Sequence, residues 1–251
     1  MAFEEQQPFD PASFEHIPVL LNECLTGLAI DPAGTYLDGT AGGAGHSRQI
    51  ALRLDAAKGG RLISLDQDPD AVQTARSRLA GLPATVVQIN FRYAGQALEE
   101  LGIDKINGAL LDLGVSSHQL DDAARGFSYR ADAPLDMRMS CDGVTAAEIV
   151  NETPEKELAD LIYKYGEERK SRQIAAKIAA YRKNKEISTT KELAEIIYTV
   201  IHKTPNGIDP ATRTFQALRI AVNNELGELE NGLRGAVDLA VSGGRIVVVS
   251  F

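Results

Sequence analysis

The most constraining feature of the sequence is a regular alternation of short apolar runs with helical stretches in its first half. Four runs have the composition of buried strands: 35–38, 61–66, 85–90 and 108–114. Helical stretches at 46–57, 69–79 and 94–101 separate them. This alternation predicts an α/β fold with a mostly parallel sheet covered on both faces. The first, second and fourth runs end at or near an aspartate, and ligands of such sheets bind beyond these ends.

The alternation stops after the fourth run. The next convincing strand, 245–251, begins about 130 residues later, whereas a crossover between parallel strands needs only about 30. Roughly a hundred residues are therefore surplus, and they have helical character. Two capping boxes begin helices there, Thr145 with Glu148 and Thr189 with Glu192. The sequence predicts a helical domain inserted into the sheet domain.

Two further helix starts set the expected domain boundaries. Thr153–Pro154 and Asp209–Pro210 each place a cap residue before a proline at the first helical position. We expect the helix that begins near Pro210 to return the chain to the sheet. The predicted sheet domain is therefore discontinuous, 1–120 plus 208–251, and the helical insertion is 121–207.

The last predicted strand reaches the end of the sequence. A parallel strand in that place leaves an apolar edge unless something covers it. We expect either that the C-terminal strands of the sheet are missing from this chain, or that a partner, such as a second copy in a homodimer, completes the sheet.

Composition excludes several classes of protein. The 251 residues are 44% hydrophobic and 24% charged, as in a globular chain of one or two domains. No apolar run approaches the roughly 18 residues of a membrane span, and the first basic residue is Arg48, too late for a signal peptide. Cys24 and Cys141 are far apart, which argues against a disulfide framework or a thiolate zinc cluster. The predicted location is the cytoplasm.

Charge is distributed unevenly along the chain. The net charge is −9, which disfavours uniform adhesion to nucleic acid. Residues 164–185 nevertheless hold eight basic and two acidic side chains, so this segment carries +6 and the remainder −15. The segment is either a solvated helix face or a stripe that contacts phosphates.

A glycine-rich turn, LDGTAGGAGHS at 37–47, is the strongest functional signal. Its four glycines between a strand and a helix let the backbone pass close to a ligand. Asp66 ends the next strand, 21 residues past Gly45, a spacing that suits a carboxylate accepting the hydroxyls of an adenosine ribose. The alternative is a tight turn plus a helix cap at Asp66. Arg48 replaces the third glycine of a nicotinamide motif, so a single nucleoside such as S-adenosylmethionine fits better.

A second constellation, DLGVSSHQ at 112–119, follows the fourth run. Gly114 permits an abrupt turn, and Ser116, Ser117 and nearby carbonyls could accept hydrogen bonds from a substrate amine. Methyl transfer to an exocyclic amine needs such acceptors, because the nitrogen lone pair is delocalised into the ring. The alternative is an ordinary turn between a strand and a loop.

The sequence does not support a metal site. His16, His46, His118 and His202 show neither an HExxH motif nor i,i+4 pairing, so we expect each to be a local hydrogen-bonding group. No feature marks Cys141 as a nucleophile.

With these residues in hand, the chain resembles the bacterial small-subunit ribosomal RNA methyltransferase H family, also called MraW. The family pattern continues past Ser250–Phe251, where this chain ends. The matching segments cover nearly the whole chain: HIPVLL at 16–21, DGTAGGAGHS at 38–47, LDLGVSSHQLD at 111–121, RGFSY at 125–129, PLDMRM at 134–139, YGEER at 165–169 and DPATRTFQALR at 209–219.

The resemblance implies a class I S-adenosylmethionine-dependent methyltransferase, Rossmann-like, with an inserted helical domain that recognises the substrate. It also implies methylation of the N4 amine of one cytidine in 16S rRNA, within the small ribosomal subunit at the decoding centre. Carried over by position, the cofactor contacts fall on Ala44, Gly45, His46, Asp66, Phe91, Asp112 and Gln119, with Phe91 beside the adenine.

Substrate positioning is predicted for four further residues. We expect Ser116 and Ser117 near the amine, and Asp136 and Arg138 near the target nucleotide. Phe127 or Tyr129 is expected to stack on the flipped base. The alternatives are core packing for the aromatic rings and an internal ion pair for Arg138.

Three other residue patterns in this half have structural interpretations. Met137 and Met139 are expected in the core, and Tyr165–Gly166 is predicted to stop a helix. Residues 212–219 are expected to form a buried amphipathic helix whose arginines tie the insertion to the sheet.

Two hypotheses from other classes remain open. A non-catalytic ribosome-binding factor would keep the fold and the helical insertion, and its motivation is the missing C-terminal strands. A nicotinamide-dependent oxidoreductase shares the arrangement of strand, glycine turn and acidic residue, although Arg48 counts against it. Binding of S-adenosylmethionine separates the leading hypothesis from both.

Overall fold

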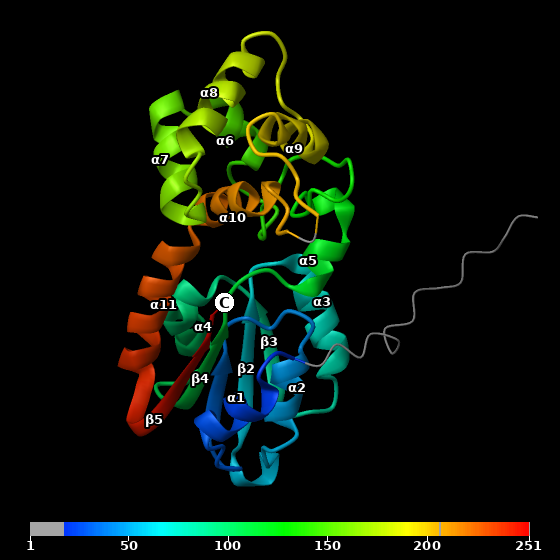
Figure 1. The fold of residues 1–251 in the computed structure, drawn as a ribbon. Helices are drawn as coiled ribbons and strands as arrows, with labels where there is room; N and C mark the ends of the chain where they lie inside the picture. The colour runs from blue at the N-terminus through cyan, green and yellow to red at the C-terminus, as the bar shows by residue number, and fades with distance from the viewer. Residues whose placement is uncertain (1–17, 206, 251) are drawn as a thin grey trace, which may run out of the picture.

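One half of the molecule is a five-stranded parallel sheet (Figure 1). The computed structural model describes residues 18–205 and 207–250, so the predictions for His16 and Phe251 lie outside the described residues. The strand order is β3-β2-β1-β4-β5, and every neighbouring pair is parallel. The strands are β1 Thr35–Asp38, β2 Arg61–Asp66, β3 Ala84–Gln88, β4 Ile106–Asp112 and β5 Ala240–Val249. The prediction of an α/β fold with a parallel sheet is confirmed.

Helices cover both faces of the sheet. On one face lie α1 Leu21–Leu28, α2 Gly45–Ala51 and α3 Pro69–Arg78, and on the other α4 Ala94–Glu100 and α11 Glu225–Leu239. Successive strand side chains point to opposite faces, so Tyr36 packs in the first of these cores and Leu37 in the second. Burial on both faces is the reason that the strands read as continuous apolar runs.

The other half is a group of helices with its own core, at the opposite end of the molecule in Figure 1. It comprises α6 Ala146–Glu152, α7 Glu155–Gly166, α8 Ser171–Arg182, α9 Thr190–Tyr198 and α10 Ala211–Val222. The predicted capping boxes begin α6 and α9. Helices α7 and α10 begin one residue later than predicted, with proline at the cap position and no side-chain cap. Asp209 still accepts a hydrogen bond from the amide of Ala211, at 2.9 Å.

Helix α10 packs differently from our expectation. The sequence predicts that the helix near Pro210 belongs to the sheet domain, but its buried side chains Ala211, Phe215 and Leu218 lie in the core of the helical group. The return to the sheet is made by α11, which follows α10 after Asn223 and the left-handed residue Asn224. The boundaries at 121 and 207 stay predictions, while the contacts of α10 belong to the helical group.

Smaller differences concern where elements end. Helix α2 ends at Ala51 rather than at Ala57, and Asp55 then caps a short 3₁₀ turn, Ala56–Lys58. Strand β3 ends at Gln88, because the Asn90 side chain caps the next 3₁₀ turn, Phe91–Tyr93. Strand β5 begins at Ala240, five residues before the predicted start. Within the described ranges, no helix is long and apolar enough to cross a membrane.

Candidate functional site

The turns that leave β1, β2 and β4 meet at the carboxyl edge of the sheet. The amide of Gly42 donates to Asp66 Oδ2 at 2.8 Å, which ties the turn after β1 to the end of β2. The amide of Asp112 donates to Thr40 Oγ1 at 2.7 Å, which ties the same turn to the end of β4. Three of the predicted segments are therefore brought together, at the edge where ligands of such sheets bind.

Asp38 is the internal support of this turn. It is fully buried, and it accepts hydrogen bonds from Ser47 Oγ at 2.6 Å and from the amide of Thr40 at 3.0 Å. Burial raises the pKa of Asp38 above its usual value, against the opposing effect of these hydrogen bonds. Asp38 therefore fixes the shape of the turn and presents no surface to a ligand.

Two glycines of the turn are required for different physical reasons. Gly42 has φ 48°, in the left-handed region that a residue without Cβ adopts at little cost. A Cβ on Gly45 would lie 2.4 Å from Cγ of Pro18, so this glycine allows the chain before α1 to pack on the start of α2. Ala44 also has a positive φ, 60°, and is fully buried. The predicted positions 44–46 thus form the strained corner where the turn becomes α2.

Asp66 presents a partly buried carboxylate at this corner. Each oxygen accepts one backbone hydrogen bond, Oδ2 from Gly42 at 2.8 Å and Oδ1 from Asp68 at 2.9 Å. Burial raises the pKa of Asp66 to about 6; these two hydrogen bonds oppose the rise, and the charges of Asp68 and Asp38 add to it. At neutral pH the carboxylate is therefore mostly ionised, and each oxygen keeps a lone pair for a further donor.

His46 links the beginning of the described chain to the end of β4. Its side chain is 7% exposed, with Nδ1 3.5 Å from Asp112 Oδ2 and Nε2 3.1 Å from the carbonyl of Val19. Because a carbonyl only accepts hydrogen bonds, Nε2 carries a hydrogen. Among the described residues, no three acidic, histidine or cysteine side chains are grouped to hold a metal ion.

Phe91 stands in the 3₁₀ turn that follows β3. A Cβ on Gly232 of α11 would lie 2.2 Å from Cδ2 of this ring, and a Cβ on Gly39 would lie 2.9 Å from Cβ of Phe91. The Phe91 side chain is therefore inserted between the glycine turn and α11. Its backbone lies at the predicted edge, and contact with an adenine stays a prediction.

Helix α5, Ser117–Asp121, carries the predicted residue Gln119. Gln119 is buried and donates from Nε2 to Asp68 Oδ2 at 2.7 Å. Ser116 and Gln119 form a capping box in which the Ser116 hydroxyl accepts the amide of Gln119, at 3.2 Å. The hydroxyl of Ser117 has no hydrogen bond within the described chain. The Ser117 hydroxyl is therefore fully available to a substrate, whereas that of Ser116 already accepts one hydrogen bond.

Asp136 and Arg138 form an ion pair with each other. Arg138 Nη2 lies 2.7 Å from Asp136 Oδ2, and Nε lies 2.9 Å from Oδ1. Burial raises the pKa of Asp136, but the hydrogen bonds and charge of Arg138 outweigh this effect and hold the pKa below its usual value. The internal ion pair considered for Arg138 is therefore present, and a role near the target nucleotide stays a prediction.

The aromatic residues expected to stack on a base are packed in the helical group. Phe127 is 6% exposed and lies in the core with Met137 and Met139, so this arrangement leaves no ring face for a base. Tyr129 packs edge-on against Phe215, with ring centroids 5.4 Å apart, and its hydroxyl lies 3.0 Å from Thr212 Oγ1. The core positions expected for the two methionines are confirmed.

Sequence reasoning missed three residues of the site. Thr40 joins the turn to β4, and Asp68 pairs with Arg125 at 2.9 Å while accepting from Gln119. The Asp68–Pro69 dipeptide signals a helix start, and Asp68 does cap α3 by accepting the amide of Asp70. Local patterns carried no signal for the ion pair, because its partner is far away in the sequence.

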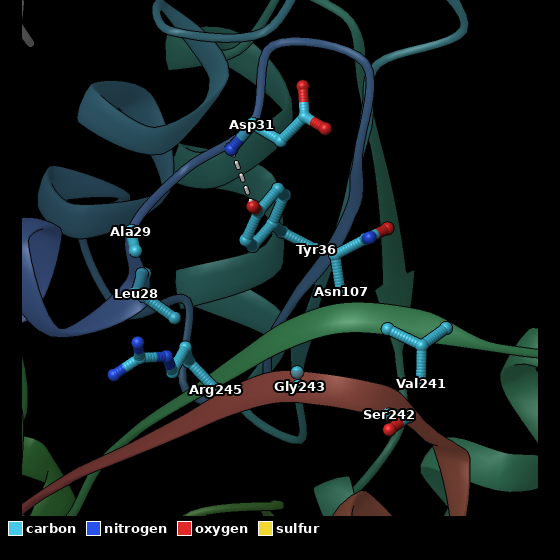
Figure 2. A pocket seen from close by; sticks show the side chains of 10 residues that line it. Leu28, Ala29, Asp31, Tyr36, Asn107, Val241, Ser242, Gly243 and Arg245 are labelled. Carbon is cyan, nitrogen blue, oxygen red and sulfur yellow. Dashed lines mark hydrogen bonds between the residues drawn. The ribbon is translucent and has the colours of Figure 1, made fainter.

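Two surface pockets lie at the opposite, amino edge of the sheet. One, of about 240 Å³, is bordered by α1, β4 and β5, and there the amide of Asp31 donates to the buried Tyr36 hydroxyl at 2.7 Å (Figure 2). The other, of about 660 Å³, lies beside the beginnings of β2 and β3. Neither pocket is lined by a residue of the carboxyl edge. We place the candidate site at the carboxyl edge because the three turns converge there, where ligands of such sheets bind.

The sheet order, the glycine turn after β1 and the acidic residue at the end of β2 define a Rossmann-like α/β fold. Comparison with known proteins agrees. The chain belongs to the MraW methylase family, whose model matches residues 13–251.

Two relatives show how close the similarity is. A Heliobacterium mobile protein named ribosomal RNA small subunit methyltransferase H is 52% identical over 244 residues, 95% of this chain and 78% of that protein. A Deinococcus radiodurans protein of the same name is 50% identical over 242 residues, 96% of this chain and 75% of that protein. A solved rRNA methylase from Streptococcus thermophilus is 15% identical, covers 41% of this chain and 58% of that one, and gives a TM-score of 0.32, a slight likeness.

Proposed function

We propose that this protein uses S-adenosylmethionine to methylate 16S rRNA of the small ribosomal subunit, at the N4 amine of one cytidine, in the cytoplasm. The observation that carries the proposal is the convergence of the turns after β1, β2 and β4, with the carboxylates of Asp66 and Asp112 at one edge. The names of relatives about half identical to this chain support the RNA substrate.

The residues at this edge fit such a cofactor. Asp66 keeps acceptor lone pairs for the two ribose hydroxyls, and the turn at 42–46 offers backbone close to the ligand because of its left-handed corner. Gln119 and Asp112 border the same space from α5 and β4. When bound, S-adenosylmethionine supplies an activated methyl group on a positively charged sulfur.

The protein's own task is to make a weak nucleophile reactive. The cytidine amine gives its lone pair to the ring, so an acceptor that draws on its N–H bonds restores electron density at nitrogen. We assign this to the side chains at the end of β4 and the beginning of α5, where the Ser117 hydroxyl makes no hydrogen bond to another described residue and Asp112 is partly exposed. With the cofactor bound, its activated methyl group would pass to this nitrogen, and these acceptors would guide the proton that the amine gives up to solvent.

Mass spectrometry of 16S rRNA tests the whole proposal. Cells that lack the gene should lack one N4-methylated cytidine, and the wild-type gene should restore it, whereas the Asp66→Asn gene should not. Unchanged N4-methylation in cells lacking the gene would contradict the proposed substrate.

Calorimetry with S-adenosylmethionine separates this function from the non-catalytic alternative. A ribosome-binding factor that has lost catalysis need not bind the cofactor. Saturable binding to the purified protein supports the proposal. Absence of heat, with no displacement of a fluorescent cofactor analogue, would favour the alternative.

A further inference from the structure

Arg125 makes a set of contacts that spans the two halves of the molecule. Its guanidinium is 11% exposed, and Nη1 lies 2.9 Å from Asp68 Oδ2 in the turn between β2 and α3. Its Nη2 donates to the carbonyls of Arg138 and Met139, both at 3.0 Å. The planar guanidinium therefore binds both halves of the molecule. Its Nη1 binds a carboxylate of the sheet half, and its Nη2 binds two carbonyls of the helical half.

The segment around these carbonyls belongs to the helical group. Leu135, Met137 and Met139 are buried in its core, and the amide of Ala147, in α6, donates to the carbonyl of Leu135 at 2.8 Å. The hydrogen bonds of Arg125 to the carbonyls of Arg138 and Met139 therefore connect it to a segment that is packed in the core of the helical group. A weaker link runs beside it, from Gln67 Nε2 to Met139 Sδ at 3.5 Å.

The first contact leads into the candidate cofactor site. Asp68 is 1% exposed and also accepts from Gln119, so the ion pair fixes the side chain of a predicted cofactor residue. The amide of Asp68 donates to Asp66 as well. A buried carboxylate that loses its positive partner is strongly unfavourable, so Arg125 stabilises Asp68 in this position.

We propose that Arg125 is a positioning residue that couples the cofactor edge to the helical group. Through Asp68 it keeps Gln119 and the turn after β2 in place for the cofactor, and through the carbonyls of residues 138 and 139 it sets the helical group above that edge. The proposal rests on the proposed function, since it assumes that this edge binds S-adenosylmethionine.

The two contacts predict separable effects. A methionine at 125 removes both the charge and the donors. A lysine keeps the charge near Asp68, but its single nitrogen cannot reproduce the planar fork that also reaches two carbonyls. We therefore expect cofactor affinity to depend on a positive charge at residue 125. Methyl transfer to the subunit should depend on the planar guanidinium that reaches the two carbonyls.

The charge also predicts a pH effect. Three carboxylates face one another here, from Asp38 on β1, Asp66 on β2 and Asp68, while Asp70 of α3 lies 3.2 Å from Arg125 and 3.9 Å from His118 of α5. Without the guanidinium, the negative charge of Asp68 is no longer neutralised and raises the pKa of Asp66 further. Cofactor affinity should then begin to fall at a higher pH than in the wild type.

Calorimetric titration with S-adenosylmethionine between pH 5.5 and 8 tests the coupling. Arg125→Met should bind at least about tenfold more weakly at pH 7, with its acid limb displaced to higher pH. Arg125→Lys should keep its affinity within about threefold but slow single-turnover methylation of small subunits at saturating cofactor. Arg130→Met, which removes an exposed charge from the same segment, is the matched control for binding.

The outcomes are distinct. Wild-type affinity and pH profile in a folded Arg125→Met protein, checked by circular dichroism, would overturn the proposal. If that variant does not fold, Arg125→Lys decides: turnover equal to wild type would refute the coupling. Failure of the wild type itself to bind S-adenosylmethionine would instead refute the proposed function.

Discussion

At the scale of single residues, Asp66 is under two opposing demands. Burial favours the neutral acid and raises its pKa to about 6, while its proposed role as acceptor for two ribose hydroxyls favours the ionised form. The amides of Gly42 and Asp68 reconcile the two demands, because each donates to one carboxylate oxygen. At neutral pH Asp66 is therefore mostly ionised, with only a modest margin between the pH and its pKa of about 6.

That margin predicts an acid limit to cofactor binding. Below pH 6 the neutral acid predominates and offers fewer acceptor lone pairs, so affinity should fall by up to about tenfold per pH unit. Calorimetry with S-adenosylmethionine from pH 8 to 5 measures the effect. Asp66→Asn, which does not titrate, should bind weakly at every pH and lose the slope; a wild-type slope in that variant would assign the titration to another group.

The two neighbouring serines should behave differently. Ser116→Ala removes the cap of α5 and should cost about 1 kcal/mol of unfolding free energy. Ser117→Ala should leave the melting temperature unchanged and lower kcat at least about tenfold, since this hydroxyl is the one available to the amine. Thermal melts and single-turnover methylation distinguish the two; unchanged kcat in Ser117→Ala would remove it from the mechanism.

At the scale of elements, the crossing of α7 with α10 determines how the helical group closes. Gly166 is buried at the end of α7, as the predicted helix stop required, and a Cβ there would lie 2.3 Å from the carbonyl of Arg213. Arg219 of α10 makes a paired contact with Glu225 of α11, at 2.7 Å and 3.0 Å. An arginine of this helix therefore does tie the insertion to the sheet half, as expected, although through α11.

The Gly166 contact predicts a large effect of one methyl group. Gly166→Ala should push the helices apart and lower the free energy of unfolding by about 1–3 kcal/mol, because the obstacle is backbone. Gly95→Ala, in α4 with open space around the added carbon, is the control and should be neutral or stabilising by up to about 1 kcal/mol. Urea unfolding of both variants measures the difference, and equal stabilities would show that the crossing yields easily.

At the scale of the whole molecule, sequence patterns predicted those features that depend on residues close together in the sequence. Strand runs, capping boxes and the converging turns were predictable, because periodicity and glycine positions express them directly. The packing of α10 was not, since its apolar face fits either half and only contacts with α6, α7 and α9 decide. The Asp68–Arg125 pair was likewise hidden, because a buried ion pair depends on distant segments meeting.

The distribution of charge is the remaining property of the whole molecule, and its most basic segment, 164–185, belongs to the helical group. Around α8, the side chains of Arg169, Arg172, Lys177 and Lys183 are exposed, and none of the four forms an ion pair within the described chain. Others in the segment are engaged: Lys185 pairs with Glu192, and Arg182 donates to the carbonyl of Val150. The basic face, formed by these four exposed residues, is thus smaller than the basic segment of the sequence.

This basic face predicts how the protein holds an RNA-containing substrate despite its net charge of −9. Neutralising Arg169, Arg172 and Lys177 with glutamine should weaken binding to small subunits and reduce the salt dependence by about one unit for each phosphate that is no longer neutralised. Glutamine at Arg53, Lys58 and Arg61, three exposed residues near the amino edge of the sheet, removes the same charge elsewhere. Binding measured from 50 to 300 mM salt should change only in the first variant. Equal slopes in both would mean that total charge, and not this face, governs the association.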